Sequence, residues 1–355
     1  MTKKYTDIAA DLRSRIKGGA YSETRKLPTE HALAEQYGAN RQTIRHALAV
    51  LTEEGLIETK QGSGSYLSAP LPEQGHSIAI LASYINDYIF PAILQDAQRV
   101  FSESGYATLL YCTGNEVSRE RDILLHILDN PVCGILAEGT KTALPNPNLD
   151  LYQRIHSLGI PIVFLHGAYP QIKDSICISD DDFGGGYLLT KYLLQKGHKN
   201  IAGIFKSDDI QGLNRYNGYL SAFRDRGLPL PDSNILWFST KDKSRLLKDH
   251  DLSVIGPFVN AILHRCTAVV CYNDEIAFSL ISLLQKQKIK IPQEMAVVSF
   301  DDSYYSELSP VRITSLAHGT HHIGRLAAKA LIDTMKGTPA KSLAVSWKLI
   351  EKESC

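Results

Sequence analysis

The chain has 355 residues, 44% of them apolar and 21% charged, and its formal net charge is zero. This length provides for two domains with cores of their own, and the composition is that of an ordinary globular protein, which excludes fibrous and disordered classes. Residues 1–70 carry ten Lys and Arg against eight Asp and Glu, so net charge gives no indication of nucleic acid. An argument for DNA binding must therefore rest on where the basic residues lie.

The N-terminal segment Met1 to Asp11 is polar and mixed in charge, so it is not a signal peptide. No apolar run approaches the ~20 residues that are needed to span a bilayer. The six cysteines have no paired framework, and no Cys/His cluster has zinc-ligand spacing. We therefore expect a cytoplasmic protein with reduced cysteines, no membrane contact, no metal and no cofactor.

The first 67 residues contain three helical patterns followed by a short hairpin. Apolar residues recur at helical spacing from Tyr5 to Ile16, and two glycines then stop this helix. A second, short helix is expected between Thr29 and Gly38 and a third between Asn40 and Gly55, with Thr29 and Asn40 as N-caps. Residues 56–60 and 65–67 are predicted to form two strands around a glycine-rich tip.

The third of these helices has an apolar stripe on one face and a polar first turn. The stripe consists of Ile44, Ala47, Leu48 and Leu51. The polar first turn has no carboxylate and consists of Asn40, Arg41, Gln42, Thr43 and Arg45. Such a helix N-terminus suits a major groove, because backbone N–H groups favour phosphate while Arg and Gln contact base edges. A solvated face explains this helix equally well when it is taken alone, but the short helix and tight turn before it complete a helix-turn-helix.

This N-terminal region resembles the winged-helix domain of GntR-type regulators over residues 4–67. The resemblance rests on the run K-L-P-T-E-x-x-L-A-x-x-Y-G-A-N-R-x-T-I-R-x-A-L-x-x-L-x-x-x-G-L-I at residues 26–57, followed by Q-G-S-G-S-Y-L. The family usually has serine where this chain has Asn40, and both are good N-caps. The resemblance implies that the DNA is lined by Lys4, Glu30, Asn40, Arg41, Gln42, Thr43, Arg45, Gln61 and Gly62. Because Glu30 repels phosphate, we expect it to orient an arginine or to accept a hydrogen bond from a cytosine amino group.

Residues 68–77 contain two prolines and a glycine without periodicity, which predicts a linker between a DNA-binding domain over residues 1–67 and a second domain over residues 78–355. In the second domain, short apolar runs alternate with helical patterns. These runs are residues 78–82, 107–111, 134–137, 162–165, 201–205, 268–271 and 296–300. Strands without polar alternation are typical of parallel sheets covered on both faces. About ten strands in ~280 residues predict two sheets rather than one.

Polar and aromatic side chains follow these strands, where ligands bind in open α/β sheets. Carboxylates and amides accept from hydroxyl groups, Lys and Arg donate to them, and rings stack on sugar C–H groups, so this set suits a polyhydroxyl ligand. Polar loops follow any buried strand, and only convergence on one cleft favours a ligand site. The candidate ligand-binding residues are Tyr88, Phe90, Glu138, Lys141, His166, Asp180, Lys206, Asp208, Arg215, Asn273, Asp301 and His318.

Other motifs in the second domain have simpler explanations. Gly184 to Gly186 open a helix but do not fit a dinucleotide-binding spacing, and a tight turn with close helix packing explains them better than phosphate. Asp180 to Asp182 and the pair Asp301-Asp302 hint at glycoside hydrolysis or a metal, but adjacent carboxylates rarely point at one centre. No nucleophile elbow is present, and we expect no enzyme.

The second domain resembles the lactose-repressor and periplasmic sugar-binding fold. The resemblance rests on I-A-I-L-A-S-Y-I-N-D-Y-I-F-P at residues 78–91, A-V-V-C-Y-N-D-E-I-A at 268–277, M-A-V-V-S-F-D-D at 295–302 and T-S-L-A-H at 314–318. The segments G-I-F-K-S-D-D and Q-G-L-N-R-Y-N-G are similar to those of arabinose-responsive repressors that have this same fusion. The implied fold class is an α+β winged helix followed by a two-lobed α/β domain of the type I periplasmic-binding-protein class, with two parallel sheets.

The resemblance implies a repressor of sugar-utilisation genes that binds operator DNA as a homodimer and is released by the effector L-arabinose. The sugar would bind between the two lobes, and the dimer interface would lie on the C-terminal domain. The same architecture answering a different sugar or a nucleoside is the alternative. A GntR-type fusion to an aminotransferase would need a pyridoxal-phosphate lysine site and a longer chain.

Overall fold

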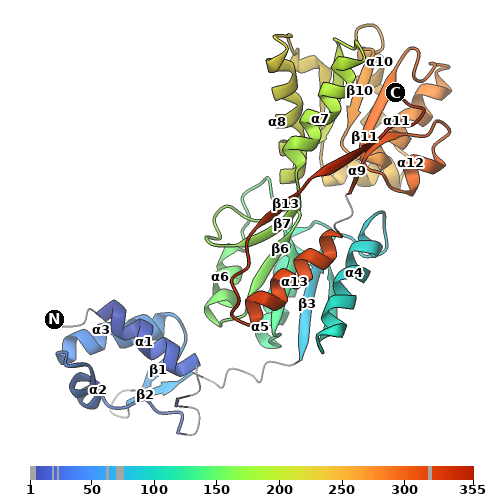
Figure 1. Cartoon of the computed structure of the whole chain (residues 1–355). Helices are drawn as coiled ribbons and strands as arrows, with labels where there is room; N and C mark the ends of the chain where they lie inside the picture. The colour runs from blue at the N-terminus through green and yellow to red at the C-terminus, as the bar shows by residue number, and fades with distance from the viewer. Residues whose placement is uncertain (1–4, 18–19, 22–23, 61–63, 69–75, 319–321) are drawn as a thin grey trace.

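The computed structural model describes residues 5–17, 20–21, 24–60, 64–68, 76–318 and 322–355. An N-terminal unit of helices and a two-stranded sheet precedes two lobes, each built on a six-stranded sheet (Figure 1). The expected fold class is confirmed. No helix in the described ranges is long and apolar enough to cross a membrane.

The N-terminal unit has the three helices and the hairpin that the sequence predicts. Its elements are α1 (Tyr5–Lys17), α2 (Glu30–Tyr37), α3 (Arg41–Glu53), β1 (Ile57–Lys60) and β2 (Gly64–Leu67), the two strands pairing antiparallel. Thr29 caps α2 by accepting a hydrogen bond from Ala32 N, and Gly38 ends that helix at a φ of 60°, which favours glycine. The predicted linker falls mostly on residues 69–75, which lie outside the described residues.

The apolar stripe of α3 is the centre of the N-terminal core. All four of its residues are at most 6% exposed, and they pack with Ile8 and Leu12 of α1. Full burial of one such side chain contributes about 1.5–3 kcal/mol, so this stripe fixes which face of α3 remains outside. Tyr5 is 43% exposed and does not belong to the core, although it shares the helical spacing of α1.

The first lobe has a sheet in the order β13-β7-β6-β5-β3-β4, in which every pairing is parallel. Its strands are β3 (Ser77–Ala82), β4 (Ala107–Cys112), β5 (Gly134–Glu138), β6 (Ile162–Leu165), β7 (Ile176–Asp180) and β13 (Leu343–Val345). Its helices are α4 (Phe90–Glu103), α5 (Val117–Asp129), α6 (Leu149–Ser157) and α13 (Ile323–Met335). One core cluster lies under α4 and α13, and another under α5 and α6.

The second lobe has a sheet in the order β14-β12-β11-β10-β8-β9. Its strands are β8 (Ile201–Lys206), β9 (Ile235–Phe238), β10 (Ala268–Cys271), β11 (Ala296–Asp301), β12 (Thr314–His318) and β14 (Trp347–Ile350). Its α-helices are α7 (Asp182–Gln195), α8 (Ile210–Asp225), α9 (Thr240–Leu247), α10 (Gly256–Ile262), α11 (Asp274–Lys286) and α12 (Tyr304–Leu308), with 3-10 turns at Asp232–Asn234 and Leu252–Val254. The pairing of β12 with β14 is antiparallel, whereas the sequence predicted parallel strands only.

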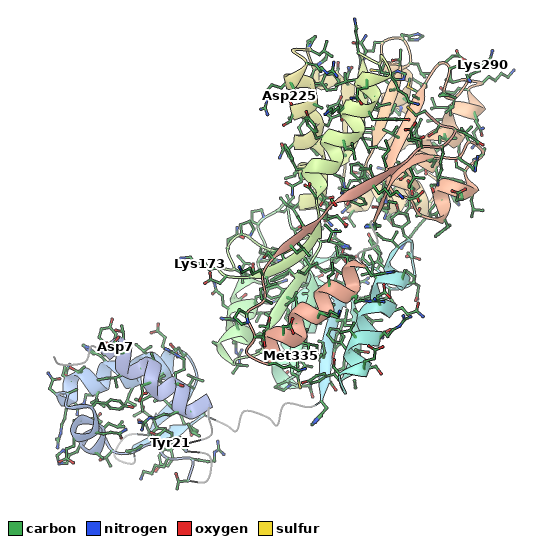
Figure 2. All side chains as sticks on the ribbon, in the orientation of Figure 1. Asp7, Tyr21, Lys173, Asp225, Lys290 and Met335 are labelled. Carbon is green, nitrogen blue, oxygen red and sulfur yellow. The ribbon has the colours of Figure 1, made fainter. Side chains whose placement is uncertain are left out.

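The chain crosses between the lobes at three places, after β7, after β12 and after β13 (Figure 1). These crossings place the carboxyl ends of strands from both sheets on either side of one space. Side chains from both lobes project into that space (Figure 2). The residues that follow the strands of two different sheets are thereby brought into one neighbourhood.

Candidate DNA-binding and ligand-binding sites

The first turn of α3 is rigidly built and its polar side chains face outward. Asn40 Oδ1 accepts hydrogen bonds from the backbone N of Thr43 at 2.7 Å and from the Thr43 hydroxyl at 2.9 Å. Arg41, Gln42 and Arg45 are exposed. This helix therefore presents two guanidinium groups and one amide at its N-terminal end, which is the arrangement that reads a major groove.

Glu30 lies against the guanidinium of Arg45. Arg45 Nε donates to both carboxylate oxygens of Glu30, at 2.9 and 3.1 Å, although the two side chains are 60% and 38% exposed. An ion pair this exposed contributes little to stability, so its main consequence is the orientation of Arg45. This geometry agrees with the expectation that Glu30 orients an arginine. The candidates Lys4, Gln61 and Gly62 lie outside the described residues.

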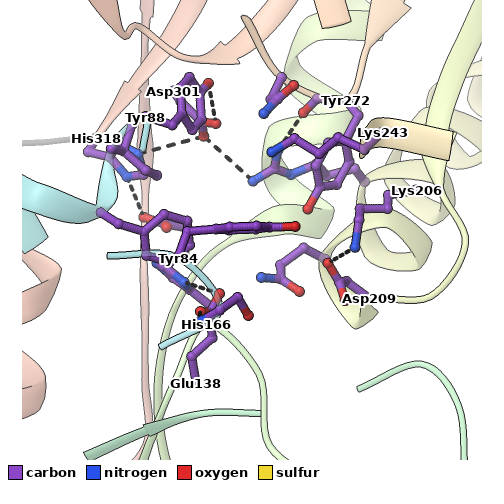
Figure 3. Close-up of a pocket in the computed structure, with 17 residues that line it drawn as sticks. Tyr84, Tyr88, Glu138, His166, Lys206, Asp209, Lys243, Tyr272, Asp301 and His318 are labelled. Carbon is purple, nitrogen blue, oxygen red and sulfur yellow. Dashed lines mark hydrogen bonds and ion pairs between the residues drawn. The ribbon is translucent and has the colours of Figure 1, made fainter. Parts of the chain in front are cut away.

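A cavity between the two lobes, here called the central cavity, brings together ten of the twelve candidate ligand residues (Figure 3). Those ten are Tyr88, Phe90, Glu138, His166, Asp180, Lys206, Arg215, Asn273, Asp301 and His318. The two exceptions are Lys141 and Asp208. Lys141 lines a neighbouring wide cleft, here called the outer cleft, and the Asp208 carboxylate turns away to accept a hydrogen bond from Thr240 N at 2.9 Å.

Arg215 is buried in the wall of the second lobe. Its Nε donates to Asp182 Oδ1 at 2.7 Å and its Nη1 donates to the carbonyl oxygen of Tyr272. The guanidinium lies 4.1 Å from the Phe300 ring centre and 4.8 Å from that of Tyr272. Its Nη2 is 3.8 Å from Asp301 Oδ1, beyond hydrogen-bond distance, so a ligand hydroxyl beside the pair can accept from Nη2 and donate to Oδ1.

Two buried carboxylates, Asp182 and Asp301, determine the charge environment of Arg215. Burial raises the pKa of Asp182 to about 6, against the opposing charge of Arg215. Burial lowers the pKa of Arg215, but the charges of Asp182 and Asp301 outweigh this and leave its pKa above the usual value. Arg215 is therefore a permanent cation whose partner Asp182 titrates near neutrality.

Asp301 is the meeting point of three side chains. Its Oδ2 accepts a hydrogen bond from the Tyr88 hydroxyl at 2.6 Å, and its Oδ1 lies 3.6 Å from His318 Nε2. On the other side of its ring, His318 Nδ1 is 3.1 Å from Asp180 Oδ1. Tyr88 and Asp180 belong to the first lobe and Asp301 and His318 to the second, so these contacts bridge the lobes.

The two histidines of the central cavity each face a carboxylate. His166 Nδ1 lies 3.5 Å from Glu138 Oε1, while Glu138 Oε2 accepts from Ser83 N at 2.6 Å. Burial lowers the pKa of His166 and of His318, but their hydrogen bonds to Glu138 and Asp180 and the nearby negative charges outweigh it and raise both pKa values. Both shifts favour the protonated ring, in which both nitrogens carry an N–H donor.

Lys206 has all three of its ammonium N–H groups engaged by the second lobe. It contacts Asp208 Oδ1 at 2.8 Å, donates to the Thr240 hydroxyl at 2.9 Å and forms an ion pair with Asp209. Its side chain is only 3% exposed. Lys206 therefore holds the wall of the central cavity together, and it has less capacity to donate to a ligand than the sequence suggested.

Asn273 is shared between a helix cap and the cavity. Its Oδ1 accepts from Ile276 N at 3.2 Å, which caps α11, and its Nδ2 donates to Glu275 Oε2 at 3.0 Å. Within the described part of the chain only one N–H of this amide is used, so the other can donate to a ligand. Phe90 closes the apolar side of the cavity, with its ring 6.1 Å from that of His166.

Three cavity residues have a backbone conformation that is unusual for residues other than glycine. Tyr88, His166 and Asp301 have φ values of 63°, 64° and 93°. Such conformations cost about 1–3 kcal/mol each and persist where the surrounding structure requires them, as at binding sites. Asp301 is the last residue of β11, His166 follows β6 directly and Tyr88 lies in the loop after β3, so the backbone is bent at these strand ends to aim the side chains into the cavity.

Seven residues of the central cavity were not among the candidates. They are Ser83, Tyr84, Ile89, Asp209, Gln211, Lys243 and Tyr272. Most follow a predicted strand, and Asp209 belongs to the strand-end pattern itself, so the same signal could have found them. Lys243 could not be found in this way because it lies in α9, after the edge strand β9, which the apolar pattern missed.

The central cavity is small and adjoins a larger space. Its volume is about 60 Å³, which holds roughly four to six waters at ~10–15 Å³ each. The outer cleft of about 850 Å³ shares Ser83, Tyr84, Tyr88 and Lys243 with it. The central cavity therefore has room for one small polar molecule, and it adjoins the outer cleft at these shared residues.

The carboxylate runs do not form a metal or hydrolytic site. Asp180 faces His318, Asp181 caps α7 at Gly184 N and Asp182 faces Arg215, so the three diverge. Asp302 likewise turns away from Asp301 and pairs with Lys352 at 2.6 Å. Within the described ranges, no group of three or more His, Cys, Asp or Glu side chains has the arrangement of a metal site.

Two family models match this chain. The one described as bacterial regulatory proteins of the gntR family covers residues 4–67, and the one described as a periplasmic binding protein-like domain covers residues 190–355. Together with the helix-turn-helix and the cavity between the lobes, these matches define a DNA-binding transcription regulator with an effector-binding domain, and not an enzyme.

Relatives of known function narrow the class. The arabinose metabolism transcriptional repressor of Geobacillus stearothermophilus is 35% identical over 337 residues, which are 94% of this chain and 91% of the relative. The repressor of the same name from Halalkalibacterium halodurans is 33% identical over 351 residues, or 95% and 90% of the two chains. This chain belongs to the family of arabinose metabolism transcriptional repressors.

Solved structures agree on the fold. The transcription regulator CcpA of Lactococcus lactis superposes with a TM-score of 0.67 at 19% identity, over 78% of this chain and 98% of its own. The transcriptional regulator CelR in its complex with cellobiose superposes with a TM-score of 0.68 at 21% identity, over 93% and 100%. At these identities the likeness shows a shared architecture only.

Proposed function

We propose that L-arabinose is the effector of this repressor and that it binds in the central cavity. The observation that carries the proposal is the meeting of Arg215 and Asp301 in one cavity, with an open donor and an open acceptor 3.8 Å apart. Membership of the arabinose repressor family supports the identity of the sugar.

The chemistry of the cavity suits a small polyhydroxyl ligand. Arg215 Nη2 supplies a donor, Asp301 Oδ1 an acceptor, and His166 and His318 supply polar rings from opposite lobes. Phe90 provides an apolar face for sugar C–H groups. Hydrogen bonds to charged groups contribute about 1.5–3 kcal/mol each, so two such anchors are sufficient for a specific sugar site.

Sugar and DNA binding are coupled in this proposal through the lobe arrangement of a cytoplasmic homodimer. A two-fold dimer on a pseudo-palindromic operator doubles the contacts that one winged helix makes. The sugar contacts both lobes, so it favours their closed arrangement and repositions the paired DNA-binding domains. The coupling is reciprocal, so a tenfold loss of DNA affinity with sugar bound corresponds to about 1.4 kcal/mol in either direction.

The test is calorimetric titration of the full chain with L-arabinose, D-xylose, D-ribose, D-galactose and adenosine, followed by a gel shift on operator DNA with each ligand that binds. We expect L-arabinose to bind in a one-to-one ratio per chain and to release the DNA. Release by another sugar or by adenosine, with no effect of L-arabinose, would retain the site and replace the ligand. Among the relatives of lower sequence identity, the ribose operon repressor of Escherichia coli, at 25%, is named for a different sugar.

A further inference from the structure

A polar cluster joins the two lobes beside the central cavity, and Asn115 is at its centre. Asn115 lies after β4 in the first lobe, is 2% exposed and has a φ of 57°. Its Nδ2 donates to Asp209 Oδ1 at 3.0 Å and to the Thr240 hydroxyl at 2.7 Å, both in the second lobe. Both hydrogens of this nitrogen are therefore used across the boundary between the lobes.

The oxygen of the same amide is fixed by the first lobe. Asn115 Oδ1 accepts from the backbone N of Lys141 at 2.7 Å, and the backbone N of Asn115 donates to the Thr113 hydroxyl at 3.2 Å. The orientation of the amide is thus determined, with its oxygen toward its own lobe and its nitrogen toward the other. Only an amide of this length meets both requirements, since an aspartate has no donor for Asp209.

The loop that holds the Asn115 oxygen is itself anchored and makes further contacts across the boundary. Glu120, 0% exposed, accepts hydrogen bonds from Asn146, Asn148, Tyr152 and Tyr169. From the loop so anchored, Thr142 Oγ1 accepts from Ile210 N at 3.0 Å, and Ala143 N donates to the Asp208 carbonyl at 3.3 Å. The boundary on this side is therefore a set of four hydrogen bonds between firmly held groups.

The second-lobe partners of Asn115 are connected to the wall of the central cavity. Asp209 and Thr240 are both held by the buried ammonium of Lys206, which lines that cavity. Asn115 itself lines the outer cleft and not the central cavity. The contact across the lobes and the ligand site thus share Lys206, while Asn115 does not reach the ligand.

We propose that Asn115 is a positioning residue for effector binding, which holds the lobes together outside the central cavity and so sets the affinity for the sugar without touching it. This inference rests on the proposed function, in which the sugar bridges the lobes. If a ligand binds only the closed arrangement, its apparent affinity is its affinity for the closed form multiplied by the fraction of protein that is closed. Loss of the Asn115 contacts lowers the closed fraction, and the affinity for every sugar falls by the same factor.

The first measurement is calorimetry on full-length Asn115→Ala, with L-arabinose and a weaker sugar such as D-xylose. We expect both affinities to fall roughly tenfold, as for the loss of two hydrogen bonds across the boundary, with their ratio unchanged. The matched control is Asn130→Ala, because Asn130 donates only within its own helix turn, to the His126 carbonyl at 3.2 Å. A changed ratio between the sugars would mean that Asn115 touches the ligand, and unchanged affinities would remove the proposal.

A donor-acceptor exchange tests the geometry directly. Asn115→Asp alone should weaken sugar binding more than Asn115→Ala, because it places a second carboxylate beside Asp209. Because Asp209 also lines the central cavity, the comparison is made against Asp209→Asn alone. Asn115→Asp should weaken sugar binding less in the Asp209→Asn background than in the unsubstituted protein, since the new amide at position 209 can donate to the new carboxylate at position 115. An equal or larger loss in that background would overturn the assignment.

A measurement without sugar separates this proposal from the proposed function. The amides of Ile210 and Ala143 donate across the boundary, so their hydrogen exchange should accelerate in Asn115→Ala, while the amides of β4 exchange as in the unsubstituted protein. Equal exchange in both proteins would refute a role in holding the lobes together. A protein that binds no sugar would refute the proposed function, and the exchange result would still decide the role of Asn115.

Discussion

Arg215 and Asp301 are the two residues that test the proposed ligand site most directly. Both are buried, both face the central cavity, and each has hydrogen-bonding capacity directed at the other. Arg215→Ala and Asp301→Ala should each lower the affinity for L-arabinose roughly tenfold to a hundredfold, through loss of a charge-assisted hydrogen bond. A gel shift with and without the sugar should show that these variants retain the operator at sugar concentrations that release the unsubstituted protein.

The control for this pair is Arg224→Ala, which removes an exposed guanidinium from the same helix as Arg215. It should respond to sugar normally. If both cavity variants release DNA at the ordinary sugar concentration, the central cavity is not the effector site. Variants that no longer fold are recognised by loss of operator binding in the absence of sugar, which the proposal expects to be intact because neither residue lies near α3.

Arg45 and Glu30 form the pair to test on the DNA side. Arg45→Ala should cost about 1–3 kcal/mol of specific operator affinity and relax base preference, because Arg45 is exposed at the start of α3. Glu30→Ala should relax preference at the same base pair if it orients Arg45. The two effects should then be non-additive in a double-mutant cycle of operator affinities. Additive losses, or a sequence-selective footprint of full strength from Arg45→Ala, would contradict this assignment.

The position of a residue at the end of a strand predicts which site it lies near better than it predicts where its side chain points. It placed Arg215, Asp301 and His318 in a common site because the edges of parallel sheets are fixed by topology. It misplaced Asp208, whose carboxylate turns back to Thr240 N, since the rotamer of a loop residue depends on contacts far away in sequence. It gave Lys206 a ligand role although the structure shows three protein partners for its ammonium group.

At the scale of elements, helices α7 and α8 pack through glycines. A Cβ added at Gly218 would lie 2.0 Å from the carbonyl oxygen of Phe183, and one added at Gly186 would lie 2.0 Å from that of Arg215. The obstacles are backbone atoms, which cannot rotate away. The sequence predicted close helix packing for the three glycines at 184–186, and the contacts of Gly186 confirm it.

Gly218→Ala should therefore lower the free energy of unfolding by about 1–3 kcal/mol or more, which is the cost of overpacking. It should also weaken sugar binding, because α8 carries Arg215. The matched control is Gly256→Ala, where no atom lies within 4 Å of the added Cβ. It should be neutral or stabilising by up to about 1 kcal/mol. Chemical denaturation of both variants measures the difference, and equal stabilities would show that the two helices can separate without cost.

The strands show where an apolar pattern fails. All seven apolar runs are strands in the structure. Six of them lie in the interior of a sheet, where strands are buried on both faces, and the seventh, β4, is an edge strand with Leu109 41% exposed. The pattern missed β7, β9, β12, β13 and β14. Three of these, β9, β13 and β14, are edge strands, and β7 and β12 lie next to an edge; β9 exposes Trp237 by 38%. An apolar pattern also cannot predict that β14 runs antiparallel to β12, since the direction of a strand depends on how the chain crosses from β13 and not on composition.

At the scale of the whole molecule, buried acids predict how stability depends on pH. Burial raises the pKa of Asp182 to about 6 and that of Asp274 to about 7, with the charge of Asp301 adding to the second shift. Between the usual pKa near 4 and these values the folded state binds more protons than the unfolded state, so the free energy of unfolding falls as pH rises through this window. The raised pKa values of His166 and His318 act in the same direction at higher pH.

We therefore expect the full-length protein to be more stable toward urea at pH 5 than at pH 8. Each of the two strongly shifted acids, Asp182 and Asp274, should contribute at most on the order of 3 kcal/mol to this difference. Asp274→Asn removes one titrating group outside the central cavity and should reduce the slope. The carboxylates with lowered pKa values, Asp180 and Asp208, lose their contribution only below their usual range and do not oppose this trend. A stability that rises from pH 5 to pH 8 would contradict the burial argument.

The division of the chain into two working parts gives the final prediction. The sequence predicts a linker at residues 68–77, and the structure has separate cores on either side of it, one in α1–α3 and the others in the two lobes. Brief proteolysis should cut first in this segment, because a linker between two folded domains, as the sequence predicts here, is the preferred substrate of proteases. The fragment that starts near residue 77 keeps every residue of the central cavity, so it should bind L-arabinose with the affinity of the full chain and should dimerise. Operator binding should be lost at the same rate as the cut appears. Cleavage that starts within residues 180–300, or a fragment that binds no sugar although the full chain does, would show that the two parts depend on each other for their structure.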